Sequence, residues 1–568
     1  MRASRPLPWF AASVLLGGAV AVGCTSSATG SSDIGATRDA APEGDATTSG
    51  SGSGSGPSGS SSSGSSSGAT DSGGCSSGSC TSSSSSGAGS SDSGDAEPTS
   101  GEGADGAASS SGATTGDGGY SEPRPPGPKG TVTFYLTNVD GTAQFAAQPT
   151  LQLGAGTDSY PDITIDTATT YQTIDGFGLS LTSGSAQVMS GLPAATLNQA
   201  LTELYDPVNG IGMSFIRISI GASDENASLY WYDTTAGDTT LKNFSLAGPD
   251  TQYTIPMLKK ILAIYPNLRI LGSPWSPPPW MKDNNAAIGG TLQSQYFDVY
   301  ANYLVKYIQA MQAEGIGLYA ITMQNEPLYG GNNPSMNFSQ QQEATFLESN
   351  LGPAMKAAGL STKVFAYDHN LDQWTYAQYV CANSSDYAAG SAFHLYGGVI
   401  GDMTTAHDAT GKDVWFTEYS TYAGDTLSSG AFDWHMQNVE LGAVNNWARG
   451  VIEWVTATDQ NHEPYIGNCP TCLGAFTVDG ANYTKNVAYY FVGHMAKFIR
   501  PDAVRVASTT SNNNLMNAAF ARDGVITIVV LNTAGSSQSF NVSYGGQKFS
   551  ATLESQSAAT FAWDTMAQ

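Results

Sequence analysis

Two short apolar runs in the middle of the chain each end in a glutamate: Tyr319-Ala-Ile-Thr-Met-Gln-Asn-Glu326 and Asp413-Val-Trp-Phe-Thr-Glu418. Runs of this kind are typical of strands that are buried on both faces of a parallel sheet. Six further runs lie around them, and stretches with helical periodicity separate several of the eight. The six runs are 172–178, 214–221, 268–275, 363–369, 391–396 and 450–454, and the helical stretches include 255–264, 296–313 and 340–358.

Eight strands that alternate with helices over about 330 residues predict an α/β fold, a (β/α)8 TIM barrel at residues 171–498. The alternative is a doubly wound open sheet, in which the first strand leads into a Gly-rich turn. The count of eight runs, and the lack of such a turn after 172–178, favour the barrel. Catalytic residues of a barrel lie at the C-terminal ends of its strands, which is where Glu326 and Glu418 stand.

Both ends of the ordered sequence have the composition of β-strands. Thr131-Val-Thr-Phe-Tyr-Leu-Thr137 is rich in β-branched and aromatic residues, and Asp162-Ile-Thr-Ile-Asp166 alternates between polar and apolar residues. Near the C-terminus, 515–520, 525–531, 539–544 and 557–563 also favour strands, with no helix among them. These stretches predict one β-sandwich side domain formed by residues 129–170 together with 499–568.

The N-terminus has the features of an export signal. A basic start and an apolar run from Trp9 to Val22 predict a signal peptide at residues 1–23, and the run is too short for a membrane span. Cys24 directly follows Ala21-Val22-Gly23, which resembles a bacterial lipobox with Ala21 where Leu is usual. We therefore expect lipidation of Cys24 and anchoring at the bacterial cell envelope, with ordinary secretion as the alternative.

Residues 24–128 are rich in Ser and Gly and contain almost nothing to bury. Such a segment cannot offset its chain entropy by forming a core, so we expect a disordered linker that tethers the rest of the chain. Cys75 and Cys80 lie inside it, and a local disulfide is favoured over a zinc site because no histidine or second cysteine pair is near.

The overall charge excludes some partners. The chain has 22 Lys and Arg against 48 Asp and Glu, a formal net charge of −26. Nucleic-acid binding needs clustered cations, and so does a polybasic membrane patch. We therefore expect no nucleic-acid partner, and membrane contact only through the N-terminal lipid.

The two strand-end glutamates suggest a specific chemistry. Glycoside cleavage uses two carboxyl groups in one pocket, one to protonate the leaving oxygen and one to attack the anomeric carbon or activate water. A single strand-end Glu is usually solvated or paired. Glu326 stands in Gln324-Asn-Glu-Pro327, which places an amide beside its carboxyl group. Glu418 follows apolar residues, and burying its charge among them would cost free energy unless the carboxyl group has a function. Trp275, Trp454 and His394 also end strands, although core packing is the default for each of them.

Other chemistries lack their motifs. The sequence has no His-Glu-x-x-His, no Gly-x-Ser-x-Gly and no Walker loop, so the chemistries that use these motifs are disfavoured. Cys469-Pro-Thr-Cys472 is a Cys-x-x-Cys, for which a loop disulfide is favoured over redox or metal chemistry in an exported protein. Cys381 is left over, and we expect it to be buried and inert.

The ordered chain, from about residue 131 to the C-terminus, resembles glycoside hydrolase family 30, the family of lysosomal glucosylceramidase and of bacterial and fungal β-1,6-glucanases. The matching stretches are Tyr171-Gln-Thr-Ile-Asp-Gly-Phe-Gly178, Arg217 with Ser219-Ile-Gly-Ala-Ser-Asp224, Gly272-Ser-Pro-Trp-Ser-Pro-Pro-Pro-Trp-Met-Lys282, Gln324-Asn-Glu-Pro327, Phe393-His-Leu-Tyr396, Phe416-Thr-Glu418 and Trp454 with Asp459.

The resemblance implies a barrel with an attached β-sandwich, a retaining mechanism, and no metal or cofactor. It implies Glu326 as the general acid/base and Glu418 as the nucleophile, with carboxyl groups about 5–5.5 Å apart and a raised pKa for Glu326. It also implies that Asn325 binds the sugar 2-hydroxyl. The residues implied to line the −1 subsite are Arg217, Trp275, His394, Tyr396 and Trp454.

One departure from the family concerns the choice of substrate. Members related to glucosylceramidase carry an Asp after Leu-Thr in the first βα loop, whereas here Leu181-Thr182 is followed by Ser183. We expect a glucosylceramidase-like enzyme that cleaves β-glucosidic bonds in a carbohydrate or glycolipid. The alternatives are the same mechanism on β-1,6-glucan, a β-galactoside, a β-fucoside or xylan, or an inactive surface carbohydrate-binding protein.

Overall fold

The computed structural model describes residues 120–246 and 248–566. The expected signal peptide, Cys24 with its lipid, and the pair Cys75 and Cys80 lie outside the described residues, as does the expected linker up to residue 119. Within the part that the structure describes, no helix combines the length and the apolar character needed to cross a membrane.

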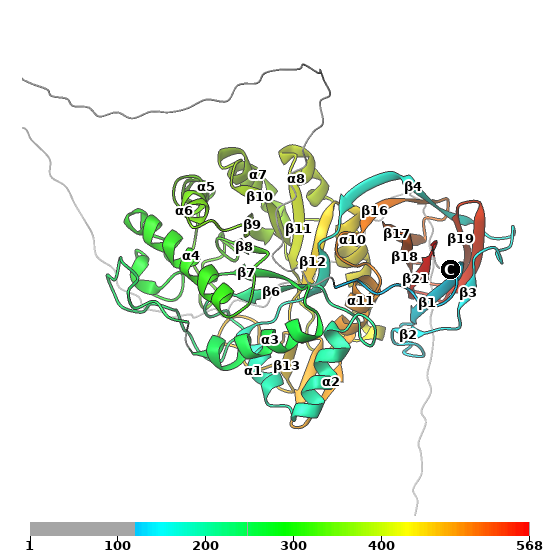
Figure 1. The fold of residues 1–568 in the computed structure, drawn as a ribbon, viewed down its shortest axis with the longest axis horizontal. Helices are drawn as coiled ribbons and strands as arrows, with labels where there is room; N and C mark the ends of the chain where they lie inside the picture. The colour runs from blue at the N-terminus through cyan, green and yellow to red at the C-terminus, as the bar shows by residue number, and fades with distance from the viewer. Residues whose placement is uncertain (1–119, 247, 567–568) are drawn as a thin grey trace, which may run out of the picture. The chain divides into compact units, whose positions relative to one another are not determined.

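Eight parallel strands form a closed barrel, which confirms the predicted fold (Figure 1). The first and last strands of the sheet order meet through two backbone hydrogen bonds, from Ser214 N to Phe177 O at 3.0 Å and from Leu181 N to Arg217 O at 2.7 Å. Each of the eight apolar runs overlaps one barrel strand. The strands are β5 (Gly176–Leu179), β6 (Phe215–Ser219), β7 (Arg269–Ser273), β8 (Ala320–Thr322), β9 (Lys363–Asn370), β10 (Ala388–His394), β11 (Asp413–Glu418) and β12 (Ala448–Glu453).

Helices lie around the outside of the barrel, with α4 to α8 beside β7 to β11 in Figure 1. The stretch 340–358 forms α5 and α6 joined by a π-helical turn at Leu347–Leu351, and Ser339 begins it with a capping box to Gln342. The helices are α1 (Ser183–Ser190), α2 (Ala194–Tyr205), α3 (Ile255–Ile264), α4 (Phe297–Ala313), α5 (Gln340–Phe346), α6 (Gly352–Ala357), α7 (Trp374–Asn383), α8 (Asp402–Thr410), α9 (Ala431–His435), α10 (Leu441–Asn445) and α11 (Val487–Ala496).

Apolar side chains fill the barrel interior below the strand ends. Phe365 and Trp415 stack with ring centroids 3.7 Å apart, and they belong to a cluster with one buried residue from each of several other strands. Beneath them, Asp175 accepts a hydrogen bond from the Trp415 indole at 2.7 Å and pairs with Arg269 and Arg449. Side chains therefore fill the interior at the N-terminal end of the barrel.

The side domain is a β-sandwich built from both ends of the ordered chain, as predicted. β1 (Thr131–Thr137) pairs antiparallel with β21 (Ala558–Asp564), so the two ends of the chain form one sheet. Phe540, Phe561 and Trp563 are part of its own apolar core. The remaining strands are β2 (Ala146–Ala147), β3 (Leu151–Gln152), β4 (Asp162–Thr173), β16 (Val504–Thr510), β17 (Leu515–Arg522), β18 (Val525–Asn532), β19 (Gln538–Tyr544) and β20 (Gln547–Leu553).

Several strands have no counterpart in the sequence predictions. β16 and β20 mix polar residues with few apolar ones and are only partly buried, so their period-two pattern is weak. A separate three-stranded sheet lies after the last barrel strand, formed by β13 (Ala457–Asp459), β14 (Phe476–Asp479) and β15 (Asn482–Lys485). The long loop between β13 and β14 carries Cys469 and Cys472 and reaches the barrel mouth.

Candidate active site

Two carboxyl groups meet at the C-terminal end of the barrel. Glu418 is the last residue of β11, and Glu326 follows β8 in a left-handed backbone conformation with φ of 48°. The Glu326 amide donates a hydrogen bond to the Asp368 carbonyl at 3.0 Å, which fixes this strained turn against β9. Carboxylate oxygens of Glu326 and Glu418 lie within 4.8 Å of each other, and both groups are almost completely buried.

His394, at the end of β10, stands between these carboxyl groups. Its Nδ1 lies 3.2 Å from Glu326 Oε1 and 3.8 Å from Glu418 Oε1, and its Nε2 lies 3.1 Å from Asp368 Oδ1. Burial alone would lower the pKa of His394. The charge of Glu418 and the hydrogen bonds to Asp368 and Glu326 outweigh burial and raise this pKa to about 9. His394 is therefore a cation at neutral pH, and it donates from both ring nitrogens.

Arg217, from β6, is fully buried beneath the pair. Its guanidinium contacts Glu418 Oε2 at 2.5 Å, Asp368 Oδ2 at 2.8 Å and Asn325 Oδ1 at 2.6 Å. The same group lies 4.8 Å from the centroid of the Trp275 ring, a cation–π distance. Arg217 thus orients the Glu418 carboxylate and the Asn325 amide, and its contact with Asn325 Oδ1 leaves the amide nitrogen of Asn325 available to a ligand.

Asp368 holds the cations of the site, a role that the sequence predictions missed. It is fully buried and accepts hydrogen bonds from Arg217, His394 and three hydroxyl groups. Burial favours the neutral form, but the Arg217 charge and the His394 contacts hold the pKa of Asp368 well below its usual range. The hydroxyl donors are those of Ser273, Thr322 and Thr417.

The two catalytic candidates have opposite pKa shifts. Burial raises the pKa of Glu326, but the hydrogen bond from His394 and the charges of His394 and Arg217 outweigh burial, so the pKa of Glu326 lies below its ordinary range. Burial also raises the pKa of Glu418, and the charges of His394 and Arg217 do not fully offset this. The expectation of a raised pKa for Glu326 is therefore wrong for this arrangement, because the His394 cation bonds directly to Glu326.

Aromatic side chains form the wall of the site. Trp275, after β7, and Trp454, after β12, lie with ring centroids 5.5 Å apart. Tyr396, after β10, donates its hydroxyl to Glu418 Oε1 at 3.0 Å and contacts Ser420 Oγ at 2.9 Å. Tyr396 is 40% exposed, so it stands at the mouth, whereas both tryptophans are buried. All eight predicted catalytic and substrate-binding residues thus lie at one end of the barrel.

Asp224, and not Ser183, is the residue of the first loops that interacts electrostatically with the carboxyl pair. The Ser183 hydroxyl is engaged with Tyr230, Asp250 and Thr254. Asp224 accepts from Asn332 through Oδ2, and its buried Oδ1 has no hydrogen-bond partner among the described residues. Burial and the charges of Glu418 and Glu326 raise the pKa of Asp224 to about 7. The quoted stretch Ser219–Asp224 contained this residue, but its position at the pocket could not be deduced from spacing.

His369 is a second residue that the sequence predictions left out. It is buried, its Nε2 lies 3.8 Å from Glu326 Oε1, and its Nδ1 has no partner among the described residues. Burial lowers the pKa of His369 against the opposing charge of Glu326. A neutral imidazole therefore lies beside the candidate acid/base, on the side of β9.

In the described part of the chain, two groups of side chains are close enough together to bind a metal ion, but neither has its ligand atoms free. Glu326, His394 and Glu418 are close enough to share one, but His394 uses both ring nitrogens on carboxylates. Cys469 and Cys472 lie near Glu225, but they form a disulfide, so neither supplies a thiolate. Cys381 is buried and free, and its sulfur lies 3.5 Å from Ser391 Oγ.

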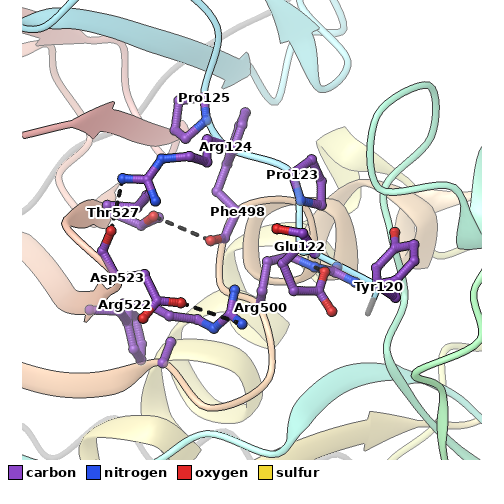
Figure 2. A pocket seen from close by; sticks show the side chains of 14 residues that line it. Tyr120, Glu122, Pro123, Arg124, Pro125, Phe498, Arg500, Arg522, Asp523 and Thr527 are labelled. Carbon is purple, nitrogen blue, oxygen red and sulfur yellow. Dashed lines mark hydrogen bonds and ion pairs between the residues drawn. The ribbon is translucent and has the colours of Figure 1, made fainter. Parts of the chain in front are cut away.

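A cavity of about 360 Å³ lies elsewhere, between residues 120–125 and the sandwich (Figure 2). Three arginines line it, and each is paired with an acidic group: Arg500 with Glu122, Arg124 with Asp564, and Arg522 with Asp523. None of the residues at the barrel mouth lines this cavity. It is therefore distinct from the carboxyl pair.

A closed barrel with two buried carboxyl groups within 4.8 Å, enclosed by tryptophans, defines a glycosidase. Comparisons with known proteins agree. The glycosyl hydrolase family 30 TIM-barrel model matches residues 174–499, and the family 30 beta sandwich model matches residues 502–561. The chain belongs to glycosyl hydrolase family 30 and is a retaining glycoside hydrolase.

Three relatives illustrate the range of the family. Endo-1,6-beta-D-glucanase neg1 of Aspergillus fumigatus is 33% identical over 459 residues, which cover 75% of this chain and 92% of the relative. Lysosomal acid glucosylceramidase of Mus musculus is 26% identical over 435 residues, covering 71% and 83%. The solved structure of the endo-beta1,6-glucanase BT3312 has a TM-score of 0.73 and 35% identity, and covers 77% of this chain and all of that one.

Proposed function

We propose that this protein is an endo-β-1,6-glucanase that cleaves β-glucosidic bonds by double displacement. The observation that carries the mechanism is the approach of Glu326 and Glu418 to within 4.8 Å, close to the separation of about 5–5.5 Å that retaining enzymes use. Similarity to known proteins supports the choice of substrate, because relatives named endo-1,6-beta-glucanases are 33–35% identical to this chain. Those named glucosylceramidases are 26–28% identical.

Glu418 is the proposed nucleophile. Arg217 and Tyr396 each donate a hydrogen bond to a different oxygen of its carboxylate, which sets the direction of attack on the anomeric carbon. Asn325, held by Arg217 through its carbonyl oxygen, presents its amide nitrogen to the sugar 2-hydroxyl. Hydrogen bonds to this hydroxyl strengthen in the transition state of such reactions.

Glu326 is the proposed general acid/base. It protonates the departing oxygen as Glu418 attacks, and it then removes a proton from the water that hydrolyses the glycosyl-enzyme. Because the two carboxyl groups lie within 4.8 Å of each other, they titrate as a coupled pair. The reactive form is the singly protonated pair with its proton on Glu326 and its charge on Glu418.

Trp275 and Trp454 are proposed to contact the apolar face of the sugar, and Asp224 Oδ1 to accept a hydroxyl at its distal side. A glycolipid substrate such as glucosylceramide is the second candidate, supported by the similarity to the mouse enzyme. A β-galactoside, a β-fucoside or xylan remains an alternative substrate. In each case the Asp224 carboxylate would have to bind a hydroxyl group of that sugar.

A hydrolysis screen tests the proposal. Purified enzyme is incubated with the β-1,6-glucan pustulan, and with laminarin, galactan, xylan, glucosylceramide and aryl β-glycosides. We expect the highest kcat/KM on pustulan, with oligosaccharides of intermediate length as the first products. Release of glucose alone would contradict endo action, and faster cleavage of glucosylceramide would favour the second candidate. No hydrolysis of any substrate would support a carbohydrate-binding protein.

We also propose that the enzyme is exported and carries a lipid on Cys24. The basis is the sequence Ala21-Val22-Gly23-Cys24 after an apolar run, which lies outside the described residues. Labelling of cells with a radioactive fatty acid should mark the wild type and spare Cys24→Ser. Release of unlabelled wild-type enzyme into the medium would instead indicate ordinary secretion.

A further inference from the structure

The Cys469–Cys472 disulfide packs against the sugar-binding wall of the active site. Cys472 is 1% exposed and belongs to a small apolar cluster with Trp275, Trp454 and Val455, separate from the main core. Cys469 is partly buried against the same cluster. A disulfide that served only to tie a surface loop would have no need to lie behind both tryptophans of the pocket.

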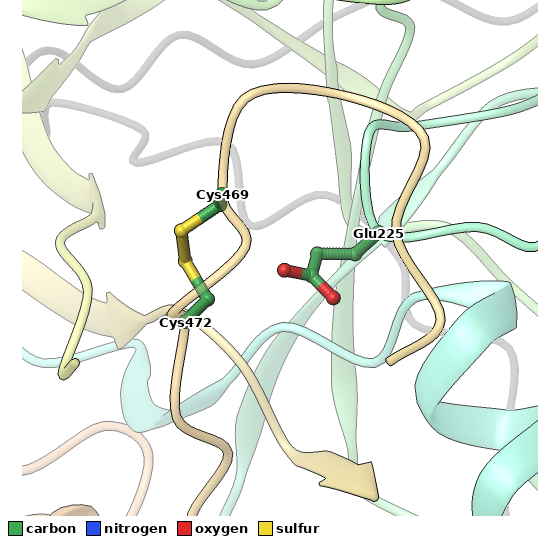
Figure 3. Close-up of side chains that lie close together, drawn as sticks. All are labelled: Glu225, Cys469 and Cys472. Carbon is green, nitrogen blue, oxygen red and sulfur yellow. A yellow bond between two sulfur atoms is a disulfide. The ribbon is translucent and has the colours of Figure 1, made fainter. Parts of the chain in front are cut away.

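A buried carboxyl group links the disulfide to Trp454. Figure 3 shows the Glu225 carboxyl group pointing toward the sulfurs, and one of its oxygens lies within 4.8 Å of both of them. Glu225 also interacts with the Trp454 side chain, and burial together with the charge of Asp224 raises the pKa of Glu225 well above its usual range. The Glu225 carboxyl group therefore lies beside the disulfide, which packs in one cluster with Trp454.

A second line of contacts leads from the disulfide to the nucleophile. Cys472 Sγ lies 3.5 Å from Ser420 Oγ, which contacts the Tyr396 hydroxyl at 2.9 Å, and this hydroxyl donates to Glu418 at 3.0 Å. The backbone supports the same contact, because Leu473 N donates to the Thr421 carbonyl at 2.8 Å. The loop after Glu418 and the loop of the disulfide are thus joined next to the reacting carboxylate.

We propose that Cys469 and Cys472, through their disulfide, are positioning residues for the glycosidase site. The bond holds Trp454 in place to contact the sugar and, through Ser420, holds Tyr396 in place to orient Glu418. The inference rests on the proposed function, because Trp454 and Tyr396 are given their roles there. A dithiol reductant converts the bond into two thiols and is itself oxidised to a disulfide. The separated sulfurs no longer fit between Glu225 and the tryptophans.

The activity test uses the full chain with Cys75→Ser and Cys80→Ser as background, so that Cys469 and Cys472 are the cysteine pair left for a reductant to act on. In this background we compare the enzyme with and without dithiothreitol, and with Cys469→Ser/Cys472→Ser. The substrate is the aryl β-glycoside that the enzyme cleaves fastest. The matched control is Cys381→Ser, which alters a buried thiol in α7, away from the pocket.

Reduction and the double serine variant should each raise KM about tenfold, the loss expected for a weakened polar and stacking contact. Tm should fall by only about 2–5 °C, because the loop that the bond closes is short. Cys381→Ser should leave KM unchanged without reductant and should respond to reduction as the parent does, whereas the KM of Cys469→Ser/Cys472→Ser should not change further when reductant is added. An unchanged KM, or a loss of kcat that merely follows the loss of folded protein, would overturn the proposal.

A second measurement does not depend on activity. Hydrogen–deuterium exchange should accelerate after reduction in peptides that cover 419–423 and 453–475, and stay unchanged in the sandwich. Glu225→Gln keeps an acceptor for Trp454 and should preserve slow exchange at 453–459, whereas Glu225→Leu should not. Unchanged exchange in both segments would overturn the inference, even if the oxidised enzyme cleaved no β-glycoside and the proposed function had failed.

Discussion

Glu326 and Glu418 come from two different barrel strands and approach the same ring nitrogen, His394 Nδ1, at 3.2 Å and 3.8 Å. A cation between two carboxyl groups lowers the cost of burying both of them, and their mutual repulsion makes it harder to ionise the second once the first is ionised. Double displacement needs the proton on Glu326 and the negative charge on Glu418, which is the opposite of the order that the pKa shifts favour in the free site.

Replacing Glu418 with Ala should remove the nucleophile. We expect kcat on aryl β-glycosides to fall by at least about 10⁴-fold, because no covalent intermediate can form. Added azide should restore turnover by entering the space left by the carboxylate, and the product should be the α-glycosyl azide. Product analysis by NMR checks this. A variant with normal activity, or a β-glycosyl azide, would contradict the assignment.

Replacing Glu326 with Gln should remove the proton donor but keep the volume of the side chain. We expect kcat/KM to fall about 10²–10⁴-fold on substrates with poor leaving groups and far less on activated aryl glycosides. The measurement is a series of aryl β-glycosides whose phenols differ in pKa. Equal losses across the series would show that Glu326 does not protonate the leaving group.

His394 should make stability depend on pH on the alkaline side. Its pKa is raised to about 9, above the ordinary value of about 6.5, so its charge stabilises the fold fully below about pH 6.5. This contribution is lost as the pH rises through about 9. The Tm difference between wild type and His394→Gln should therefore shrink between pH 7 and pH 10. A difference that stays constant over this range would mean that His394 is neutral.

Asp224 should contribute to sugar recognition more than Ser183. Its buried Oδ1 has no hydrogen-bond partner among the described residues, and burial and the charges of Glu418 and Glu326 raise its pKa, whereas the Ser183 hydroxyl is occupied by protein groups. Asp224→Ala should lower kcat/KM about 10–100-fold, the loss expected for a charge-assisted hydrogen bond. Ser183→Ala should change kcat/KM by less than about threefold. Steady-state kinetics on pustulan compare the two, and the reverse order of effects would contradict this role for Asp224.

The barrel could be predicted because its strands are buried on both faces, so each is a continuous apolar run such as Asp413–Glu418. The topology then places strand-end residues together, which is why Glu326 and Glu418 could be paired across the sequence. The strands of the sandwich were found where apolar residues dominate, as in 525–532, and missed in 504–510, where polar residues do.

The detailed arrangement of the site depends on side-chain contacts that cannot be deduced from the spacing of residues in the sequence. Asp368 binds both Arg217 and His394, but in the sequence it is one polar residue among several at the end of β9. The pKa order of the glutamates depends on which oxygen His394 contacts, a matter of side-chain geometry. The position of the Cys469–Cys472 disulfide behind Trp454 depends on how a long loop folds back.

The most direct test of the account uses a β-glucoside with fluorine at C2 and a good leaving group, which slows hydrolysis of the glycosyl-enzyme enough to trap it. Peptide mass spectrometry of the inactivated enzyme should find one sugar attached to Glu418, while Glu326 remains unmodified. A sugar attached to any other residue, or no covalent adduct on an enzyme that inverts the anomeric configuration of its substrate, would contradict the account.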